Sequence, residues 1–226
     1  MTLLSRTVHR IKAVQYKIAT LPKEWVKCPV HFCCGAEEQY ARFVLELKPE
    51  DKLLLHHRGL AAYVARGGDL VRLFRSVLGD GPGVMHLRDE SRGILGGSAI
   101  LGACAALAIG VAEGMRLNKQ PGRVVAFGGD AILETGYFWE AWNYASLHKL
   151  KIVFAQDENN VAVSTPNVQR RGSNVVVRGR GYPVFRVFET SRNGGHVGVP
   201  REDIVSPVHD GLVDAAFEEA RIDVQG

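Results

Sequence analysis

The segment between residues 123 and 160 constrains the fold of this chain more than any other part. It holds two short β-rich runs, RVVAF at 123–127 and KIVFA at 151–155, and between them a stretch over 137–147 whose apolar residues recur at helical spacing. A strand, a helix and a second strand at this spacing form a βαβ unit, in which the strands are parallel and the crossover is right-handed. The sequence therefore predicts an α/β fold with a mostly parallel sheet flanked by helices.

Polar residues follow both runs where the strands are expected to end. Gly128, Gly129 and Asp130 follow the first run, and the second is followed by Asn159 and Asn160. The carboxyl ends of parallel strands open on one edge of the sheet, where carboxylate and amide oxygens suit magnesium or calcium. Glycines let the backbone approach a bulky anion, and a helix N-terminus attracts phosphate. We therefore predict a metal that bridges to a diphosphate; the alternative is a helix cap and a simple turn.

The rest of the chain is typical of one α/β domain over residues 1–226. Helices are expected at 4–18, 36–47, 70–77, 99–112 and 212–222, a strand at 52–55, and Gly-rich turns or loops at 79–83, 93–98 and 191–200. Asp69 is expected to cap the third helix and Gly79 to end it. No repeat or low-complexity linker divides the chain.

Composition and charge exclude several classes of protein. Hydrophobic residues make up 46% and charged residues 23%, which excludes disorder, collagen and coiled coil. The net charge of +4 comes without a basic stripe, so no nucleic acid partner is expected. The apolar stretch 99–112 is shorter than the ~18–20 residues of a membrane span, so no membrane is expected either. The four cysteines form no CxxC pair, which favours reduced thiols and a cytoplasmic location.

The first 23 residues contain no acidic residue and are basic, as in an organellar transit peptide. Their apolar residues recur at helical spacing until Pro22, which favours instead a packed first helix.

A set of short motifs occurs in the same order along this chain as in one known family. The motifs are CPVH at 28–31, GAE at 35–37, LKPED at 47–51, HRG at 57–59, GGDL at 67–70, MHL at 85–87, GILG at 93–96, GDA at 129–131, NN at 159–160 and STP at 164–166. The chain resembles the alpha subunit of the thiamine-diphosphate-dependent 2-oxo-acid dehydrogenase first component, nearest to its pyruvate and acetoin branch. The resemblance covers about residues 5–187, with a weaker echo around His196.

This resemblance implies a thiamine-diphosphate-binding fold and a role for each matching residue. Magnesium would be bound by Asp130, Asn160 and the carbonyl group of Ala162. The diphosphate would be contacted by Arg58, His196, Gly129 and the backbone N–H groups of Ala131 and Ile132. The aminopyrimidine ring would touch the backbone of Ala99 and Leu101, and His31 would line the mouth of the active site.

Several further residues near these motifs have open roles. His56 and His57 are expected to point to opposite faces as strand neighbours, so His57 is a candidate for a direct catalytic role. Glu134 would either orient the metal loop or be a solvated carboxylate at a helix start. Arg170 and Arg171 are expected to lie in a solvated loop.

The resemblance also implies an activity and partners. The family decarboxylates a pyruvate-type 2-oxo acid oxidatively, or cleaves acetoin, and passes the acyl or hydroxyalkyl group to lipoamide on an acyltransferase component. A beta subunit supplies the glutamate that activates the cofactor, and two alpha and two beta chains assemble.

Departures from the family pattern favour an alternative, a non-catalytic alpha-like protein that keeps the fold and the partner surface. Ala131 replaces the third motif glycine, and Leu60 and Ala62 replace common histidines. The part at 188–226 is shortened by a strand, helix and strand. A plain nucleotide-binding domain is a weaker alternative, because no G-x-G-x-x-G motif joins a strand to a helix.

Overall fold

The computed structural model describes residues 1–162, 165–171, 184–189 and 208–225. Five strands of these ranges form one sheet in the order β2-β1-β3-β4-β7, and all neighbouring strands run parallel. The strands are β1 (Lys52–Leu55), β2 (Ile94–Gly97), β3 (Val124–Gly129), β4 (Ile152–Glu158) and β7 (Val184–Glu189). The predicted α/β fold and its parallel βαβ unit are confirmed.

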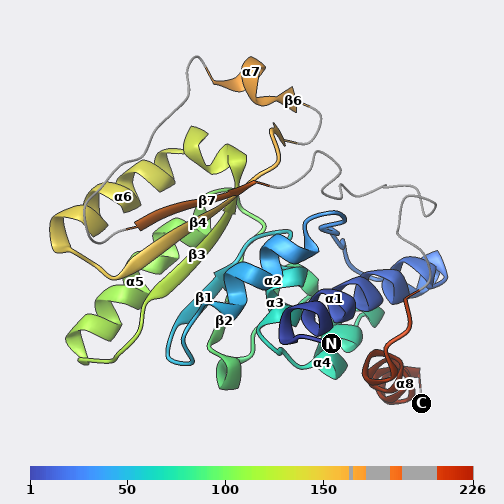
Figure 1. Ribbon diagram of the computed structural model, residues 1–226. Coiled ribbons are helices and arrows are strands. Elements are labelled where there is room, and N and C mark those ends of the chain that lie inside the picture. Colours follow the sequence, from blue (N-terminus) through green and yellow to red (C-terminus); the bar gives the residue numbers. More distant parts are fainter. Residues whose placement is uncertain (163–164, 172–183, 190–207, 226) are drawn as a thin grey trace.

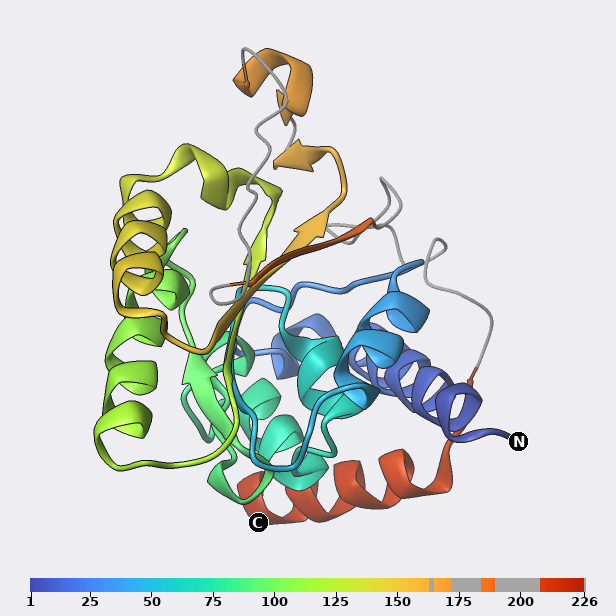
Figure 2. The same cartoon turned by 60° about the vertical axis from the view of Figure 1, so that its left-hand side comes forward.

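Helices cover both faces of the sheet (Figures 1 and 2). One face carries α1 (Leu3–Thr20), α2 (Glu37–Leu45), α3 (Leu60–Ala65), α4 (Leu70–Leu78) and α8 (Gly211–Gln225). The other carries α5 (Ala103–Leu117) and α6 (Gly136–His148). Because side chains alternate along a strand, Val125 and Phe127 pack on the first face, and Val124 and Ala126 on the second.

Short elements complete the described ranges. They are the 3-10 turns η1 (Lys23–Trp25), η2 (Val84–His86), η3 (Glu90–Arg92) and η4 (Asp130–Glu134), the hairpin strands β5 (Val161–Ala162) and β6 (Thr165–Pro166), and α7 (Asn167–Arg170). None of the helices in these ranges is long and apolar enough to cross a membrane.

Several predicted boundaries hold and others are wrong. Asp69 caps α4 by accepting a hydrogen bond from the Arg72 backbone N–H, and Gly79 ends that helix at a φ of 100°. The turn expected at 93–98 is instead the strand β2, and the helix expected at 99–112 begins at Ala103. β3 extends through Gly129 and β4 through Glu158, beyond their predicted ends.

The C-terminal helix α8 packs against α4 and α1. The Phe217 ring meets the Phe74 ring edge-on, with 5.4 Å between the centroids. The Lys17 ammonium group lies 4.6 Å from the centre of the Phe217 ring and pairs with Asp214 at 2.9 Å. The helix expected at 212–222 is therefore present and longer, whereas the loop expected at 191–200, with His196, lies outside the described residues.

Candidate functional site

The strand order distinguishes one place on the edge of the sheet. β1 and β3 are neighbours, and the chain leaves β1 toward the helices of one face and β3 toward α6 on the other. In open α/β sheets, ligands bind outside the carboxyl ends of two strands whose connections diverge in this way. His56, His57 and Arg58 directly follow β1, and Asp130 directly follows β3.

A small cavity lies at this place. Its lining includes His57, Ala99, Leu101, Gly128, Gly129 and Ile132. The rings of His31 and His57 lie 5.1 Å apart, so the structure brings His31 to the same place. The cavity measures about 20 Å³, which is room for about one water molecule. These residues therefore form one wall of a site, and a larger ligand needs further surface.

The two adjacent histidines differ in environment. They do not lie on a strand as expected, because β1 ends at Leu55 and a turn begins at His57. His56 is buried, and burial followed by the charges of His57 and Arg58 lowers its pKa well below the usual value. His56 is therefore neutral, whereas His57 is half-buried and lines the cavity.

A buried polar network holds the Arg58 side chain in place. Arg58 is 3% exposed, and its guanidinium group forms an ion pair with Asp157, with 3.0 Å between Nη2 and Oδ2. Tyr40 donates a hydrogen bond of 2.7 Å to the same Asp157 oxygen, and its Oη lies 2.9 Å from Nε2 of His56. Burial lowers the pKa of Arg58, but the charge and hydrogen bond of Asp157, together with Tyr40 and Asp130, raise it more, and the net shift is upward. Arg58 is therefore charged.

The surroundings of Arg58 fit an anionic group such as a diphosphate. Within the described residues, Nη2 of Arg58 has no hydrogen-bond acceptor of good geometry. A Cβ added to Gly129 would lie 3.5 Å from that nitrogen, so the guanidinium group faces backbone without a side chain between. A buried donor whose acceptor is poorly aligned is costly, and an anion placed against Gly129 would reduce that cost.

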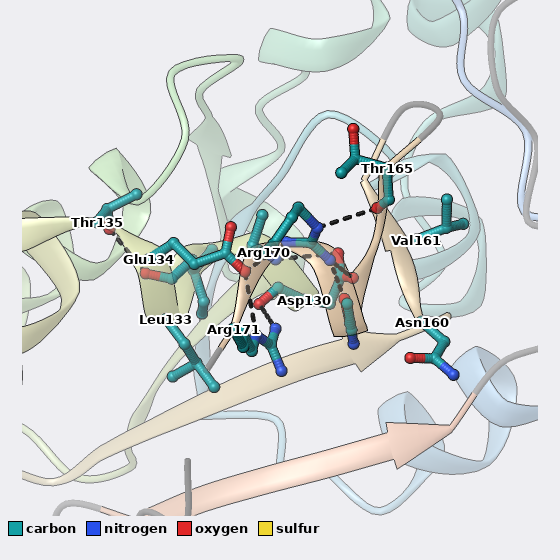
Figure 3. A network of polar contacts seen from close by, with 12 residues as sticks. Asp130, Leu133, Glu134, Thr135, Asn160, Val161, Thr165, Arg170 and Arg171 are labelled. Carbon is teal, nitrogen blue, oxygen red and sulfur yellow. Dashed lines mark hydrogen bonds and ion pairs between the residues drawn. The ribbon is translucent and has the colours of Figure 1, made fainter. Parts of the chain in front are cut away.

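Two arginines from α7 and the residue after it surround the candidate metal ligand Asp130 (Figure 3). Oδ2 of Asp130 lies 2.5 Å from Nη2 of Arg170, while Oδ1 accepts a hydrogen bond of 2.9 Å from the backbone N–H of Ala131. Arg170 also pairs with Glu134 at 2.5 Å. Arg171 pairs with Glu134 at 3.1 Å and donates to the backbone carbonyl of Asp130.

The prediction that Arg170 and Arg171 lie in a solvated loop is wrong, because their side chains are only 10% and 13% exposed. The carboxylates that they meet include that of Asp130, which is itself buried. Burial raises the pKa of Asp130, and the Arg170 charge opposes this shift, with a net upward result. Glu134 pairs with both arginines and is not simply a solvated carboxylate.

Of the other two candidate metal ligands, Asn160 is turned away from Asp130, whereas Ala162 lies in a strand beside η4, the turn that begins at Asp130. Asn160 is exposed, adopts a φ of 66°, and its side chain points away from Asp130 (Figure 3). Ala162 lies in β5, paired with Thr165. The buried asparagine is Asn159, whose Oδ1 accepts a hydrogen bond from the backbone of Val161.

The donor chemistry around Asp130 nevertheless fits a cation. Both its Oδ2 atom and its backbone carbonyl already meet positively charged guanidinium groups. Oxygen atoms of this kind are the ligands that magnesium prefers. Across the described ranges no group of three or more His, Cys, Asp or Glu residues forms a ready-made metal site. A magnesium ion would therefore have to take the place of the Arg170 side chain.

Comparison with known proteins identifies a family to which this chain is similar. The sequence model of a family described as "Dehydrogenase E1 component" matches residues 8–188. The alpha subunit of acetoin:2,6-dichlorophenolindophenol oxidoreductase from Cupriavidus necator is 30% identical over 143 residues, which are 60% of this chain and 43% of that protein. The corresponding subunit from Bacillus subtilis is 29% identical over 144 residues, 61% of this chain and 43% of that protein.

A mitochondrial pyruvate dehydrogenase E1 component subunit alpha from Solanum tuberosum is 28% identical over 173 residues, 70% of this chain and 44% of that protein. The chain thus spans less than half the length of these relatives. Among solved structures, a protein from Mycobacterium smegmatis described as a thiamin diphosphate-dependent enzyme aligns with a TM-score of 0.40 and 17% identity. That alignment covers 62% of this chain and 23% of the other, and the likeness is too weak to support an inference.

Proposed function

The chain belongs to the family of the dehydrogenase E1 component, and from this premise we propose that it is the alpha subunit of a thiamine-diphosphate-dependent dehydrogenase. The substrate would be a 2-oxo acid of the pyruvate type or acetoin, as in the names of its relatives. The observation that carries the proposal is the buried Arg58 facing Gly129, at the edge where β1 and β3 diverge. In a member of this family, the positively charged group that binds the diphosphate would lie at this edge of the sheet.

In this proposal, separate groups of residues would bind the diphosphate and the aminopyrimidine ring of the cofactor. Arg58 and the Gly129 backbone hold the diphosphate, together with the backbone of Ala131 and Ile132. Asp130, Asn160 and the carbonyl group of Ala162 would hold a magnesium ion. Ala99 and Leu101 both line the cavity, and their backbone would contact the aminopyrimidine ring. His196 would add a contact to the diphosphate.

The histidines at the cavity would act on the substrate. When bound, thiamine diphosphate supplies the carbon nucleophile that attacks a carbonyl group. His31 and His57 stand edge-on, 5.1 Å apart between centroids, and both are half-buried. From this position they could hold a proton near the substrate oxygen and orient its carboxylate. The neighbouring His56 is neutral and hydrogen-bonded to Tyr40, and it would support this wall of the cavity.

The proposal requires partners. The described residues enclose room for about one water molecule at the cavity, so a beta subunit would supply the opposite wall and the activating glutamate. Two alpha and two beta chains would assemble, and the acyl group would pass to the lipoyl arm of an acyltransferase component. All four cysteines are free, which agrees with the reducing cytoplasm as the proposed location.

Isothermal titration of thiamine diphosphate, with and without magnesium, tests the proposal on the full chain alone and with a candidate beta subunit. We expect magnesium-dependent binding that tightens with the partner, and loss of that dependence in Asp130→Ala. Asp223→Ala, on the exposed side of α8, is the control. Unchanged cofactor affinity in Asp130→Ala would refute the assignment of the metal site.

The second candidate is the non-catalytic alpha-like protein, which the placement of Arg170 on Asp130 favours. Turnover of pyruvate or acetoin with an artificial electron acceptor, measured after co-expression with the beta subunit, separates the two. Activity above that of the beta subunit alone excludes the non-catalytic protein.

A further inference from the structure

We propose that Arg170 and Arg171 form a cationic latch, which occupies the Asp130 site and must be displaced before a divalent cation binds there. This inference rests on the proposed magnesium site and adds a device that controls it. The latch is defined by these two arginines on and next to α7 and by the carboxylates of Asp130, Glu134 and Glu158.

The charges around Asp130 require a cation at this place. Three carboxylates converge here, and two guanidinium groups pair with them over 2.5 to 3.3 Å. The Asp130 side chain is 4% exposed, so water cannot compensate its charge if Arg170 leaves. A buried carboxylate without a partner is strongly unfavourable. The site therefore holds either the guanidinium group or another cation.

The arginine side chains and a magnesium ion compete for the same oxygen atoms of Asp130. A magnesium ion needs carboxylate oxygens at about 2.0–2.1 Å. Nη2 of Arg170 lies 2.5 Å from Oδ2 of Asp130, where it blocks the approach of an ion to that oxygen. Arg171 at the same time donates to the backbone carbonyl of Asp130. Two positive groups at one carboxylate would also repel each other, so binding of the ion and closure of the latch exclude each other.

Hydrogen bonds of Asn167 couple the latch to Asn160. The backbone N–H of Asn167, the first residue of α7, donates a 3.1 Å hydrogen bond to the carbonyl of Asn160. The Asn167 side chain donates to Glu158 at 2.6 Å, and Glu158 also accepts from the backbone N–H of Asn160 at 3.2 Å. Closure of the latch thus holds the loop with Asn160 turned outward. Release of α7 removes the two hydrogen bonds of Asn167 and so frees Asn160 to turn toward Asp130.

The test is the affinity of the full chain for Mg²⁺, measured by calorimetry without cofactor. If the latch is closed about nine tenths of the time, it weakens the apparent affinity about tenfold. Arg170→Gln should therefore bind Mg²⁺ about tenfold more tightly, and Mg²⁺ should raise its melting temperature more than that of the native chain. Arg170→Lys keeps a cation and should stay near the native affinity. Arg221→Gln, which breaks an exposed pair on α8, is the control.

A second variant keeps the test decisive if Arg170→Gln does not fold. Glu134→Gln removes a partially exposed partner of both arginines and leaves Asp130 intact, so it should also tighten Mg²⁺ binding, by several-fold. Equal Mg²⁺ affinity in the native chain and these two variants overturns the latch but leaves the magnesium site. Absence of Mg²⁺ binding from all three, with each shown to be folded, overturns the latch and the proposed magnesium site together.

Discussion

At the scale of single residues, Asp157 determines whether Arg58 can stay buried. Arg58 is 3% exposed, so removal of the Asp157 charge in Asp157→Asn leaves a buried guanidinium group without its ionic partner, which should cost about 3–5 kcal/mol. Tyr40→Phe removes one hydrogen bond to Asp157 and keeps the ion pair, so about 1–3 kcal/mol is expected. Urea unfolding of both variants measures the difference. A smaller loss in Asp157→Asn than in Tyr40→Phe contradicts this account.

Asp51 should make stability depend on pH. Its side chain is fully buried, and burial raises its pKa. Hydrogen bonds from Arg123 and the Lys48 backbone, together with the charge of Arg123, lower the pKa by more, so that the net shift is downward. The folded state then binds a proton less readily than the unfolded chain. The stabilisation is therefore present above the unfolded pKa of about 4 and lost as pH falls through the lowered folded pKa.

Asp51→Asn should accordingly lose about 2 kcal/mol at neutral pH, mainly from its charged hydrogen bonds to Arg123. Urea titrations of both proteins at neutral pH and near pH 3 check this. The gap between the native chain and the variant should narrow in acid. A gap that stays constant over this range would show that the Asp51 charge is not the cause.

Sequence patterns located some site residues and missed others for a physical reason. Asp130 could be predicted because it directly follows a strand, and the ends of parallel strands meet. Tyr40 and Asp157 are 117 positions apart, and only the tertiary fold makes them partners. Arg170 was misjudged because a charged pair in a loop is usually solvated, and its buried partner Asp130 lies 40 positions away.

At the scale of elements, α4 offers a clean test of a helix cap. Asp69→Ala removes the side chain that accepts a 3.1 Å hydrogen bond from the Arg72 backbone N–H, and should cost about 1 kcal/mol. Asp80→Ala, beyond the other end of α4, breaks only an exposed pair with Arg75 and should cost less than about 1 kcal/mol. Thermal unfolding followed by circular dichroism compares them. Equal losses would argue against a role for the cap.

Local patterns identified long elements better than short ones. α1 and α4 have apolar residues at helical spacing over several turns, and both were predicted. α3 has six residues, too few to show a helical period, and was missed. β2 contains two glycines, which suggested a turn, but it is a strand because its backbone pairs with β1. Strand formation there depends on a partner and not on local propensity.

At the scale of the whole molecule, the βαβ unit indicated a mostly parallel sheet, because a right-handed crossover between parallel strands permits few arrangements. Its continuation could not be predicted from the same pattern. β7 pairs in parallel with β4, although the segment around it mixes Val, Arg and Gly without a clear period. The position of α8 depends on contacts with α1 and α4, which are far away in the sequence.

Docking of α8 can be tested through Phe217, which is 4% exposed and contacts both the Phe74 ring and the Lys17 ammonium group. Phe217→Ala leaves a cavity between α8 and α4 and should destabilise the protein by about 3–5 kcal/mol in urea unfolding. Ile222→Ala, at a position 63% exposed on the same helix, should change stability by less than about 0.5 kcal/mol. A small loss in Phe217→Ala would mean that α8 adds little to the core. A large loss with a single transition would mean that the sheet, α4 and α8 unfold as one unit, because the contacts of α8 then contribute to the stability of the whole fold.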